Sequence, residues 1–315
     1  MTESIRILNI VTASMSTAFF RGQLAYMKKH GLQIAVCASP GKRLHETAAN
    51  ENVQAFEISM QREISPLRDL ISLWRLYRLM RAYRPTIVNA GTPKAGLLGM
   101  LAARMARVPL RVYLLRGLRI ETAGGVKRLV LWIAERLASA CAHRVVCVSE
   151  SLRQAYVDQA LARADKTLVL GAGSSNGVNA QRFHADKDAM EKARLMRSKF
   201  GIPAAAPIIG FVGRLTRDKG IIELAGAYKK VLAEFPQTWL LLVGDLERGD
   251  AVPEETADWL RRHSQVVMSP FTADPKPYYA MMDILAFPSH REGCANVPLE
   301  AASMEVPVVG FAATG

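Results

Sequence analysis

The sequence lacks the features that mark secreted, disulfide-bonded or membrane-spanning proteins. Its four cysteines, Cys37, Cys141, Cys147 and Cys294, are scattered with no CxxC spacing, which argues against a zinc site, a redox pair or a disulfide framework. The N-terminus has no basic stretch followed by an apolar one, and charged residues interrupt the longest apolar runs well short of a bilayer span. We therefore expect a reduced, cytoplasmic protein.

Acidic residues are scarce in the first half of the chain, and this scarcity accounts for the whole net charge of +13. Residues 1–187 contain 27 basic and 12 acidic residues, whereas residues 188–315 contain 14 and 16. Such asymmetry indicates that the first half faces an anionic partner, which could be nucleic acid, a phosphorylated substrate or an acidic membrane. Zinc-finger spacing and RNP-like aromatic elements are missing, so nucleic acid is not expected.

Short β-branched runs alternate with longer amphipathic segments, which is typical of βαβ units and a parallel sheet. In the first half, the sequence predicts strands at residues 5–11, 32–39, 53–58, 86–90, 110–115, 143–149 and 166–171. The helical patterns between them include residues 17–31, 65–85 and 124–142. The predicted fold class is α/β, with a doubly wound, Rossmann-like sheet.

A charged and then Pro/Ala-rich segment from Asp186 to Pro207 interrupts this alternation once. We place an interdomain linker near residues 184–206, with domains at 1–187 and 188–315. Beyond it, the sequence predicts strands at 207–213, 238–245, 264–271, 284–289 and 307–311 and helices at 220–236, 253–263, 276–282 and 297–304. Ligands of doubly wound sheets lie beyond the carboxyl ends of the strands, so the loops there hold the candidate site residues.

One such loop, GRLTRDKG, combines glycines with cations. Gly213 ends a strand, Arg214 and Lys219 lie five positions apart in the turn, and Gly220 enters the next helix. This layout can direct two cations and the free N–H groups of a helix at one anion, such as a diphosphate leaving group, without a metal. A solvated turn with ordinary surface charges fits the same residues.

A second loop, HREGCANVPLE, precedes a helix for which we expect Pro298 at the first position and Asn296 or Val297 as the cap. Backbone N–H groups near the cap would face a ligand phosphate, and Gly293 would allow its close approach. Glu300 would fall near the third helical position. There its carboxylate either bonds back to the cap, as in a capping box, or accepts bonds from the two hydroxyls of a ribose.

Glu292 and Glu300 stand eight positions apart, which invites comparison with the paired carboxylates of a glycosidase. Glu292 precedes the predicted helix and Glu300 lies inside it, so the spacing does not fix the separation that such chemistry requires. We therefore favour ligand-binding roles over acid–base catalysis for this pair.

Four segments occur together in this chain: VLGAGSSNGVNAQRF, GRLTRDKG, LLLVGD and YYAMMDILAFPSHREGCANVPLEAASMEVPVVG. As a set they resemble the family-4 retaining glycosyltransferases of the GT-B fold, and the Glu-x7-Glu element is the most specific part. The resemblance spans nearly the whole chain. In the first half, MQREISPLRDL, TPKAGLLGMLAARMARVPLRVY and VVCVSESLR are similar to the bacterial subgroup that builds lipopolysaccharide, capsule or lipid-linked oligosaccharides.

The resemblance implies an acceptor-binding first domain and a second domain that binds a nucleotide-sugar, with UDP or GDP as the expected nucleotide. Arg214 and Lys219 would hold the diphosphate, Glu292 and Gly293 would contact the transferred sugar, and Glu300 would take the ribose hydroxyls. The further substrate-binding positions are Gly213, Asp245, Cys294, Ala295, Asn296 and Val297. Residues 242–245 and 270–273 would wall the nucleobase.

The implied reaction retains the anomeric configuration by front-face departure of the nucleotide diphosphate. It needs no cofactor and no metal, because the leaving phosphate can take the proton. The implied acceptor is a lipid-linked or lipopolysaccharide/capsule glycan.

Two first-half positions depart from the family pattern. Arg116 stands where relatives commonly carry a His, and Asn89 where a second His is frequent. Arg116 supplies charge but cannot act as a neutral acceptor, and we keep it among the catalytic candidates. Relatives usually continue for several tens of residues past the strand at 307–311, so we expect a fragment or a shortened member.

A basic amphipathic helix is predicted at residues 65–85, where apolar residues recur at helical spacing and four arginines occupy other faces. It suits an anionic membrane that presents a lipid-linked acceptor, on the inner face of the cytoplasmic membrane, and it equally suits packing on a core. Two alternatives to a transferase remain open: a non-hydrolysing nucleotide-sugar epimerase and a catalytically inactive, nucleotide-binding scaffold.

Overall fold

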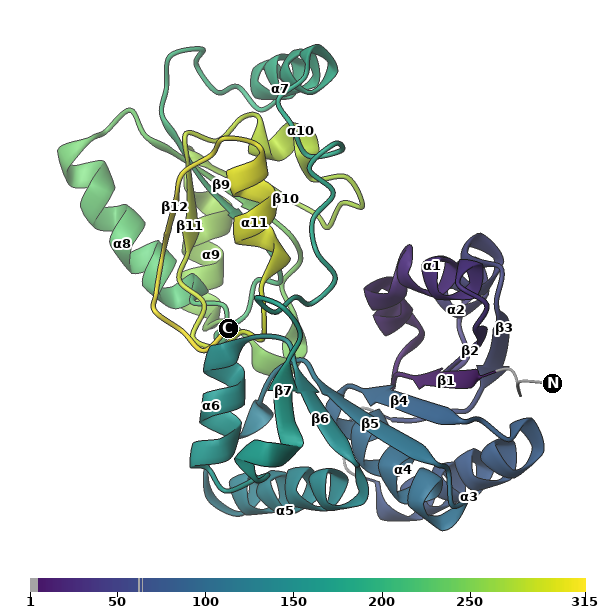
Figure 1. The fold of residues 1–315 in the computed structure, drawn as a ribbon. Coiled ribbons are helices and arrows are strands. Elements are labelled where there is room, and N and C mark those ends of the chain that lie inside the picture. The colour runs from purple at the N-terminus through teal and green to yellow at the C-terminus, as the bar shows by residue number, and fades with distance from the viewer. Residues whose placement is uncertain (1–4, 62, 64) are drawn as a thin grey trace. The chain divides into compact units, whose positions relative to one another are not determined.

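The computed structural model describes residues 5–61, 63 and 65–315, and it divides into two compact units (Figure 1). One unit extends to Asn176, and the other runs from Gly177 to Thr314. This division falls N-terminal to the 187/188 boundary expected from the sequence, because Phe183 already packs in the core of the second unit. Both units contain a parallel sheet, which confirms the predicted α/β class.

The first sheet has seven parallel strands in the order β3-β2-β1-β4-β5-β6-β7. Each of them corresponds to a predicted run, and only β4 extends past its run, by one residue: β1 (Arg6–Ile10), β2 (Gln33–Ala38), β3 (Gln54–Glu57), β4 (Ile87–Gly91), β5 (Leu110–Leu115), β6 (Arg144–Cys147) and β7 (Thr167–Val169). The strand order reverses direction after β3. The helices that follow therefore lie on the other face of the sheet from α1 and α2, as right-handed crossovers require.

The helices of this unit are α1 (Gln23–Lys29), α2 (Lys42–Glu51), α3 (Pro66–Tyr83), α4 (Pro93–Met105), α5 (Gly125–Cys141) and α6 (Glu150–Asp158), with short 3-10 turns at Ser14–Phe20, Arg119–Thr122 and Ala164–Lys166. The single helix predicted at 17–31 was wrong. Gly22 adopts a φ of +76° and separates the first 3-10 turn from α1, a backbone conformation that interrupts a right-handed helix.

The second sheet has five parallel strands in the order β10-β9-β8-β11-β12. Its elements are α7 (Lys187–Lys199), β8 (Ile208–Val212), α8 (Ile221–Glu234), β9 (Trp239–Val243), a 3-10 turn (Arg248–Asp250), α9 (Glu254–Arg262), β10 (Val266–Ser269), α10 (Lys276–Tyr279), β11 (Ile284–Phe287), α11 (Asn296–Ser303) and β12 (Val308–Gly310). One core lies between the sheet and α8 and α9, and the other lies between the sheet and α7, α10 and α11.

The segment expected to be a linker contains α7. Asp186 caps this helix by accepting a hydrogen bond from the Ala189 amide, and Ala189 and Ala193 are buried in the second unit. The many charges of the segment therefore lie on the outer face of a packed helix, and they misled the sequence prediction. No helix among the described residues is long and apolar enough to cross a bilayer.

Candidate active site

The second sheet changes winding direction between β8 and β11, which are neighbours in space. The loops that follow these two strands start at the same edge, because parallel strands end together there. They also bond directly to each other, since the His290 amide donates to the Asp218 carbonyl oxygen over 2.9 Å. The fold thus brings the two loops singled out in the sequence to one place.

Two glycines allow the backbones to approach this closely. Gly244 has a φ of +145°, and a Cβ there would collide with the carbonyl oxygen of Gly213 at the end of β8. Gly220, with a φ of +73°, caps α8, and a Cβ there would collide with the carbonyl oxygen of Pro288. Side chains are excluded at both positions, so backbone groups and cations line the start of the loop.

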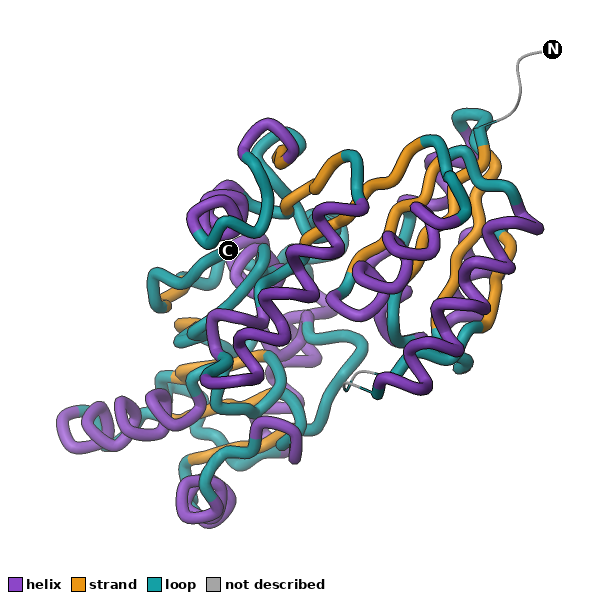
Figure 2. Tube along the Cα trace, turned by 90° about the horizontal axis from the view of Figure 1, so that it is seen from below, coloured by secondary structure: helices purple, strands orange, loops and turns teal. Residues whose placement is uncertain are grey.

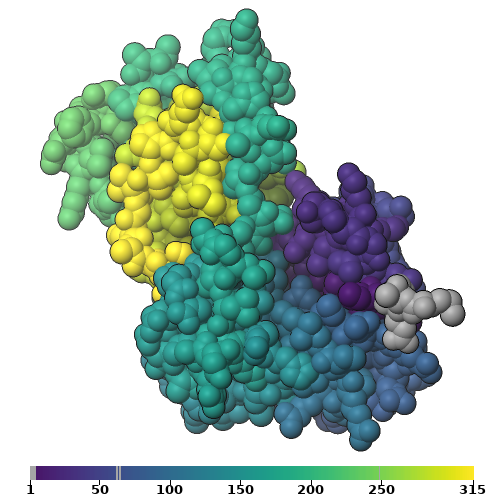
Figure 3. Space-filling view, in the orientation of Figure 1, coloured from purple at the N-terminus to yellow at the C-terminus, as the bar shows by residue number. Residues whose placement is uncertain are grey.

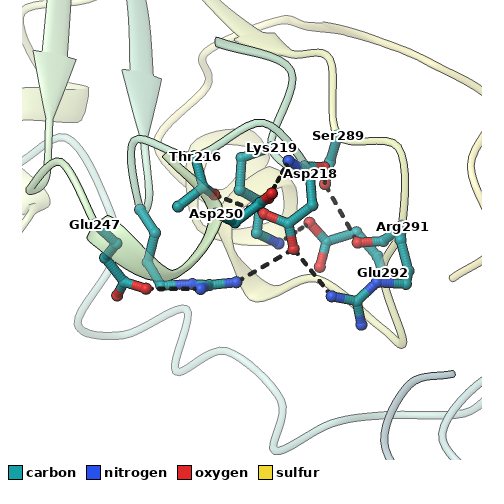
Figure 4. A network of polar contacts seen from close by, with 9 residues as sticks. Thr216, Asp218, Lys219, Glu247, Asp250, Ser289, Arg291 and Glu292 are labelled. Carbon is teal, nitrogen blue, oxygen red and sulfur yellow. Dashed lines mark hydrogen bonds and ion pairs between the residues drawn. The ribbon is translucent and has the colours of Figure 1, made fainter. Parts of the chain in front are cut away.

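The Asp218 carboxylate connects two cations of the site (Figure 4). Its Oδ2 lies 2.9 Å from Arg291 Nη2 and 3.4 Å from Arg214 Nη2, and its Oδ1 accepts a 2.6 Å hydrogen bond from Thr216. Burial alone would raise the pKa of Asp218, but the Thr216 hydrogen bond and the two guanidinium groups lower it overall. Asp218 therefore stays ionised at neutral pH and holds both arginines.

Other acidic groups complete this network. Glu247 Oε2 lies 2.9 Å from Arg214 Nη1, and Asp250 accepts a 2.8 Å hydrogen bond from the Asp218 amide (Figure 4). Arg291 Nε is buried and has no hydrogen-bond partner among the described residues. Arg291 and Asp218 were missed in the sequence. The sequence did show Arg291 as a third cation directly before Glu292. Its pairing with Asp218 could not be seen, because Arg291 and Asp218 are 73 positions apart.

Lys219 Nζ lies 2.5 Å from Glu292 Oε1, and both side chains are largely buried. The structure thus joins two predicted site residues from different loops in one ion pair. Each is therefore the other's counter-ion. An anionic ligand that approached Lys219 would compete with Glu292 and release its carboxylate.

The helix after the second loop begins earlier than predicted. Asn296 is its first residue and Ala295 its cap, with no side-chain capping bond, so Pro298 occupies the third position. Glu300 lies one turn inside the helix, and the capping-box interpretation was wrong. The predicted positions Gly293, Cys294 and Val297 lie in the loop and the first turn of α11.

Glu300 instead accepts a 2.8 Å hydrogen bond from the hydroxyl of Tyr279, which is fully buried. This bond fixes the orientation of the carboxylate. Burial raises the pKa of Glu300, against the opposing effects of the Tyr279 hydrogen bond and the charge of Arg182. At the first turn of the same helix, Asn296 Oδ1 is buried without a partner among the described residues.

Asp245 follows β9, beside the loop that follows β10. The Gly244 amide donates to the Ser269 carbonyl oxygen over 2.8 Å, and the Phe271 amide lies 3.4 Å from Asp245 Oδ1. The Phe271 side chain is exposed. The two segments predicted to wall a base, 242–245 and 270–273, are therefore adjacent.

Arg116 belongs to the first unit, after β5. Its Nη1 donates to the backbone oxygen of Ser175 over 2.5 Å, and its guanidinium lies 4.5 Å from the ring centroid of Phe19. Burial lowers the pKa of Arg116 to about 10, so it remains a cation at neutral pH. Asn89 does not join it, because its amide bonds to Asn9 between β1 and β4.

Free thiols and acidic groups do not gather into a metal site in the part of the chain that the structure describes. Among those residues, no group of three or more His, Cys, Asp and Glu side chains is placed to hold a metal ion. Cys37, Cys141 and Cys147 are buried thiols, and Cys294 is half-buried in the α11 loop.

Two family models match the chain, one in each half. Residues 16–173 match the glycosyl transferase 4-like domain, and residues 206–315 match the glycosyl transferases group 1. The two matches together include every strand except β1, and the second match includes both loops of the candidate site.

Individual proteins agree with the family models. The chain is 37% identical to CapM, a capsular polysaccharide biosynthesis glycosyltransferase of Staphylococcus aureus, over 98% of this chain and 80% of that protein. It is 26% identical to a UDP-Gal:alpha-D-GlcNAc-diphosphoundecaprenol alpha-1,3-galactosyltransferase of Escherichia coli, over 82% and 66% of the two proteins. The crystal structure of Anabaena Alr3699/HepE with UDP-glucose matches with a TM-score of 0.76 at 21% identity, over 99% and 81% of the two chains.

The fold, the matched families and the similarity to CapM over nearly the whole chain lead to one assignment. The chain belongs to the group 1 glycosyltransferases of the GT-B fold, of the capsule and surface-polysaccharide type.

Proposed function

We propose that this glycosyltransferase is a retaining enzyme that moves a sugar from a UDP- or GDP-sugar to a lipid-linked or lipopolysaccharide/capsule glycan, without a metal. The observation that carries the proposal is the cation cluster at the switch point of the second sheet. Arg214, Lys219 and Arg291 gather there beside the N-terminus of α11. Cations and free helix N–H groups together suit a diphosphate.

Carboxylates neutralise these cations, and a diphosphate would take over part of that role. Lys219 and Arg214 would bind the phosphates, and Asp218 would keep Arg214 and Arg291 in place. Once Lys219 turns to phosphate, the freed Glu292 carboxylate would accept hydrogen bonds from hydroxyls of the donor sugar. The ion pair at 2.5 Å would thus serve as a preformed, exchangeable contact.

The first turn of α11 would add neutral donors. Pro298 has no N–H, so the amides of Asn296 and Val297 are the ones available to a phosphate oxygen at this helix end. Glu300, one turn further on, would accept bonds from the two ribose hydroxyls while Tyr279 holds it in position. Asp245 and the segment 270–273 would contact the base.

This layout supports a front-face mechanism. The donor's leaving oxygen would be stabilised by cations and amides, and the departing phosphate would take the proton of the acceptor hydroxyl on the same face. No Asp or Glu base is then required, in keeping with Glu292 and Glu300 serving as ligands. Arg116 would supply charge in the first unit, where an arginine cannot act as a base.

The names of two relatives support the proposed acceptor class. The Escherichia coli protein is named for transfer from UDP-Gal to a diphosphoundecaprenol-linked sugar, and CapM is named for capsular polysaccharide. The solved Anabaena structure contains UDP-glucose. These names favour a UDP-sugar and a lipid-linked glycan, which would place the reaction at the inner face of the cytoplasmic membrane, with the basic first half toward anionic lipid.

A nucleotide-sugar screen tests this proposal. Unfolding temperature is measured with UDP-, GDP-, ADP- and dTDP-sugars, followed by release of the nucleoside diphosphate with and without a lipid-linked acceptor. We expect one donor to raise the unfolding temperature, release that depends on acceptor, no loss of rate in EDTA, and loss of release in Glu300→Ala. A failure of all four donors to shift the unfolding temperature would refute the donor site.

A further inference from the structure

A short turn at residues 179–183 lies beside the predicted nucleotide site, although it is far in sequence from the two site loops. The Asn179 side-chain oxygen accepts hydrogen bonds from the amides of Gln181 at 3.0 Å and Arg182 at 3.2 Å. Its backbone oxygen accepts two more, from the amides of Arg182 and Phe183, both at 2.9 Å. Asparagine stabilises turns in this way, so the backbone that carries Arg182 and Phe183 is fixed.

The turn belongs to the face of the second sheet that holds α10 and α11. The second sheet has helices on both of its faces (Figure 2), and α7, α10 and α11 lie opposite α8 and α9. Before α7 begins, the chain runs along α11, as the teal segment beside the yellow C-terminal residues in Figure 3. One turn is thus next to the helix that carries Glu300.

The Arg182 side chain reaches the loop after β10, which is one of the two segments predicted to wall the base. Its Nη2 donates to the Ala273 backbone oxygen at 3.2 Å and lies 3.1 Å from Asp274 Oδ1. The same loop carries Phe271, whose side chain is 63% exposed. An exposed aromatic ring offers a stacking surface to a planar base. Arg182 therefore ties down the loop that presents this ring.

The same turn also acts on the ribose side of the site. The Phe183 ring packs edge-on against Tyr279, with 6.2 Å between the centroids, and Tyr279 donates the hydrogen bond that orients Glu300. Ser303, on the helix of Glu300, donates to the Phe183 backbone oxygen at 2.5 Å. Burial raises the pKa of Glu300, whereas the Tyr279 hydrogen bond and the positive charge of Arg182 lower it and so favour the ionised carboxylate.

We propose that Arg182 is a positioning residue of the donor site, which holds the base loop in place and keeps the Glu300 carboxylate ready for the ribose. The inference rests on the proposed nucleotide-sugar donor and deepens it. The Arg182 and Asp274 side chains are 38% and 54% exposed, and an ion pair this exposed adds little to folding stability. Its effect is on affinity, because a loop that is already ordered costs less free energy to bind a base.

Calorimetric titration of the full chain tests this role by comparing nucleotides with inorganic pyrophosphate, which offers the two phosphates alone. UDP, GDP, ADP and dTDP are titrated first, and the nucleotide that binds most tightly is used afterwards. In Arg182→Gln we expect about a tenfold weaker Kd for that nucleotide, since a charge-assisted contact is lost. The Kd for pyrophosphate should stay unchanged, because Arg214 and Lys219 are intact.

The pH dependence of nucleotide binding separates positioning from a merely structural role. Loss of the Arg182 charge should raise the pKa of Glu300 further, so that protonation removes the ribose acceptor at a higher pH. On acidification, nucleotide binding by Arg182→Gln should therefore weaken at a higher pH than binding by the parent. Arg182→Lys keeps the charge and should restore the parent profile.

A matched control is an arginine of similar exposure on the other face of the sheet. Arg261 of α9 is 45% exposed and lies 2.7 Å from both Glu254 and Asp258. Arg261→Gln should bind the nucleotide like the parent. Arg182→Gln combined with Phe271→Ala should weaken binding by less than the product of the two single effects, because both substitutions act through one loop.

Three results would overturn the inference: unchanged nucleotide affinity in Arg182→Gln, equal weakening of nucleotide and pyrophosphate, or fully independent effects of Arg182→Gln and Phe271→Ala. Unfolding temperatures of the variants without nucleotide report on folding. If the parent binds a nucleotide more tightly than pyrophosphate and Arg182→Gln matches it, only the role of Arg182 fails. If no nucleotide binds the parent more tightly than pyrophosphate, the donor-site proposal itself fails, and this inference fails with it.

Discussion

Replacing Lys219 by Met tests the donor site most sharply, because it removes one charge and keeps the shape of the side chain. Lys219 and Glu292 are 18% and 16% exposed, so the substitution leaves a largely buried carboxylate without its counter-ion. Breaking a fully buried pair costs about 3–5 kcal/mol, and the remaining exposure reduces this to about 1–2 kcal/mol of unfolding free energy.

The effect on the donor should be larger than this loss of stability. A charge-assisted hydrogen bond to a phosphate contributes about 1.5–3 kcal/mol, which corresponds to roughly a tenfold to hundredfold weaker Kd. A thirtyfold weaker Kd would reduce the stabilisation given by donor at 100 times the parent Kd from about 2.7 to about 0.9 kcal/mol. Loss of a cation that stabilises the leaving group should lower kcat/KM by about 10²–10³.

The first unit offers a matched control. Lys94 pairs with Asp69 at the same 2.5 Å, with exposures of 11% and 19%. Lys94→Met should cost a similar unfolding free energy and leave the donor-dependent rise in unfolding temperature intact. If Lys219→Met retained that rise and released nucleoside diphosphate within twofold of the parent rate, the assignment of Lys219 to the diphosphate would be refuted.

Three further substitutions, one of them with a matched control, probe the ribose contact, the backbone and the core. Glu300→Gln should weaken donor affinity about tenfold in calorimetry, since an amide is a poorer acceptor for two hydroxyls, and unchanged affinity would argue against ribose binding. Gly244→Ala should lower the free energy of unfolding in urea by more than about 2 kcal/mol because its Cβ meets a backbone carbonyl, whereas Gly226→Ala, open on the surface of α8, should gain about 0.5–1 kcal/mol. Equal effects would show that the tight approach is not required. Burial raises the pKa of Glu135 to about 7, from an ordinary value of 4.5. The folded state then holds its proton more tightly, so this group's contribution to stability falls as pH rises from about 4.5 to 7, by up to about 3 kcal/mol. Glu135→Gln should therefore be more stable than the parent at pH 8 and nearly equal at pH 5, and a difference independent of pH would contradict this.

The sequence predicted the sheets and the site loops well, because hydrophobic periodicity and glycine placement are local signals. Spacing alone placed Arg214 and Lys219 in one turn, and their binding of an anion stays a prediction. The start of α11 was missed because Pro298 was taken as the first helical residue, its commonest place. In the structure Pro298 is the third helical residue. Glu300 therefore lies farther from the cap than expected, and it bonds to Tyr279 instead.

Contacts between distant segments could not be predicted from spacing. Asp218 and Arg291 meet only after β8 and β11 pair in the sheet, and Glu292 reaches Lys219 in the same way. The break at Gly22 depends on a positive φ, which a glycine permits but which its presence in a sequence does not predict. Charge density misled the interpretation of α7, since its apolar side is formed by only a few small residues such as Ala189 and Ala193.

The stereochemistry of the product tests the central claim most directly. The chain is incubated with the donor that it binds and a lipid-linked acceptor, and the anomeric configuration of the new linkage is read from the one-bond C–H coupling in NMR. Retaining transfer predicts the same configuration as in the donor, together with stoichiometric release of nucleoside diphosphate. An inverted linkage, or conversion of the nucleotide-sugar to an epimer without acceptor, would contradict it.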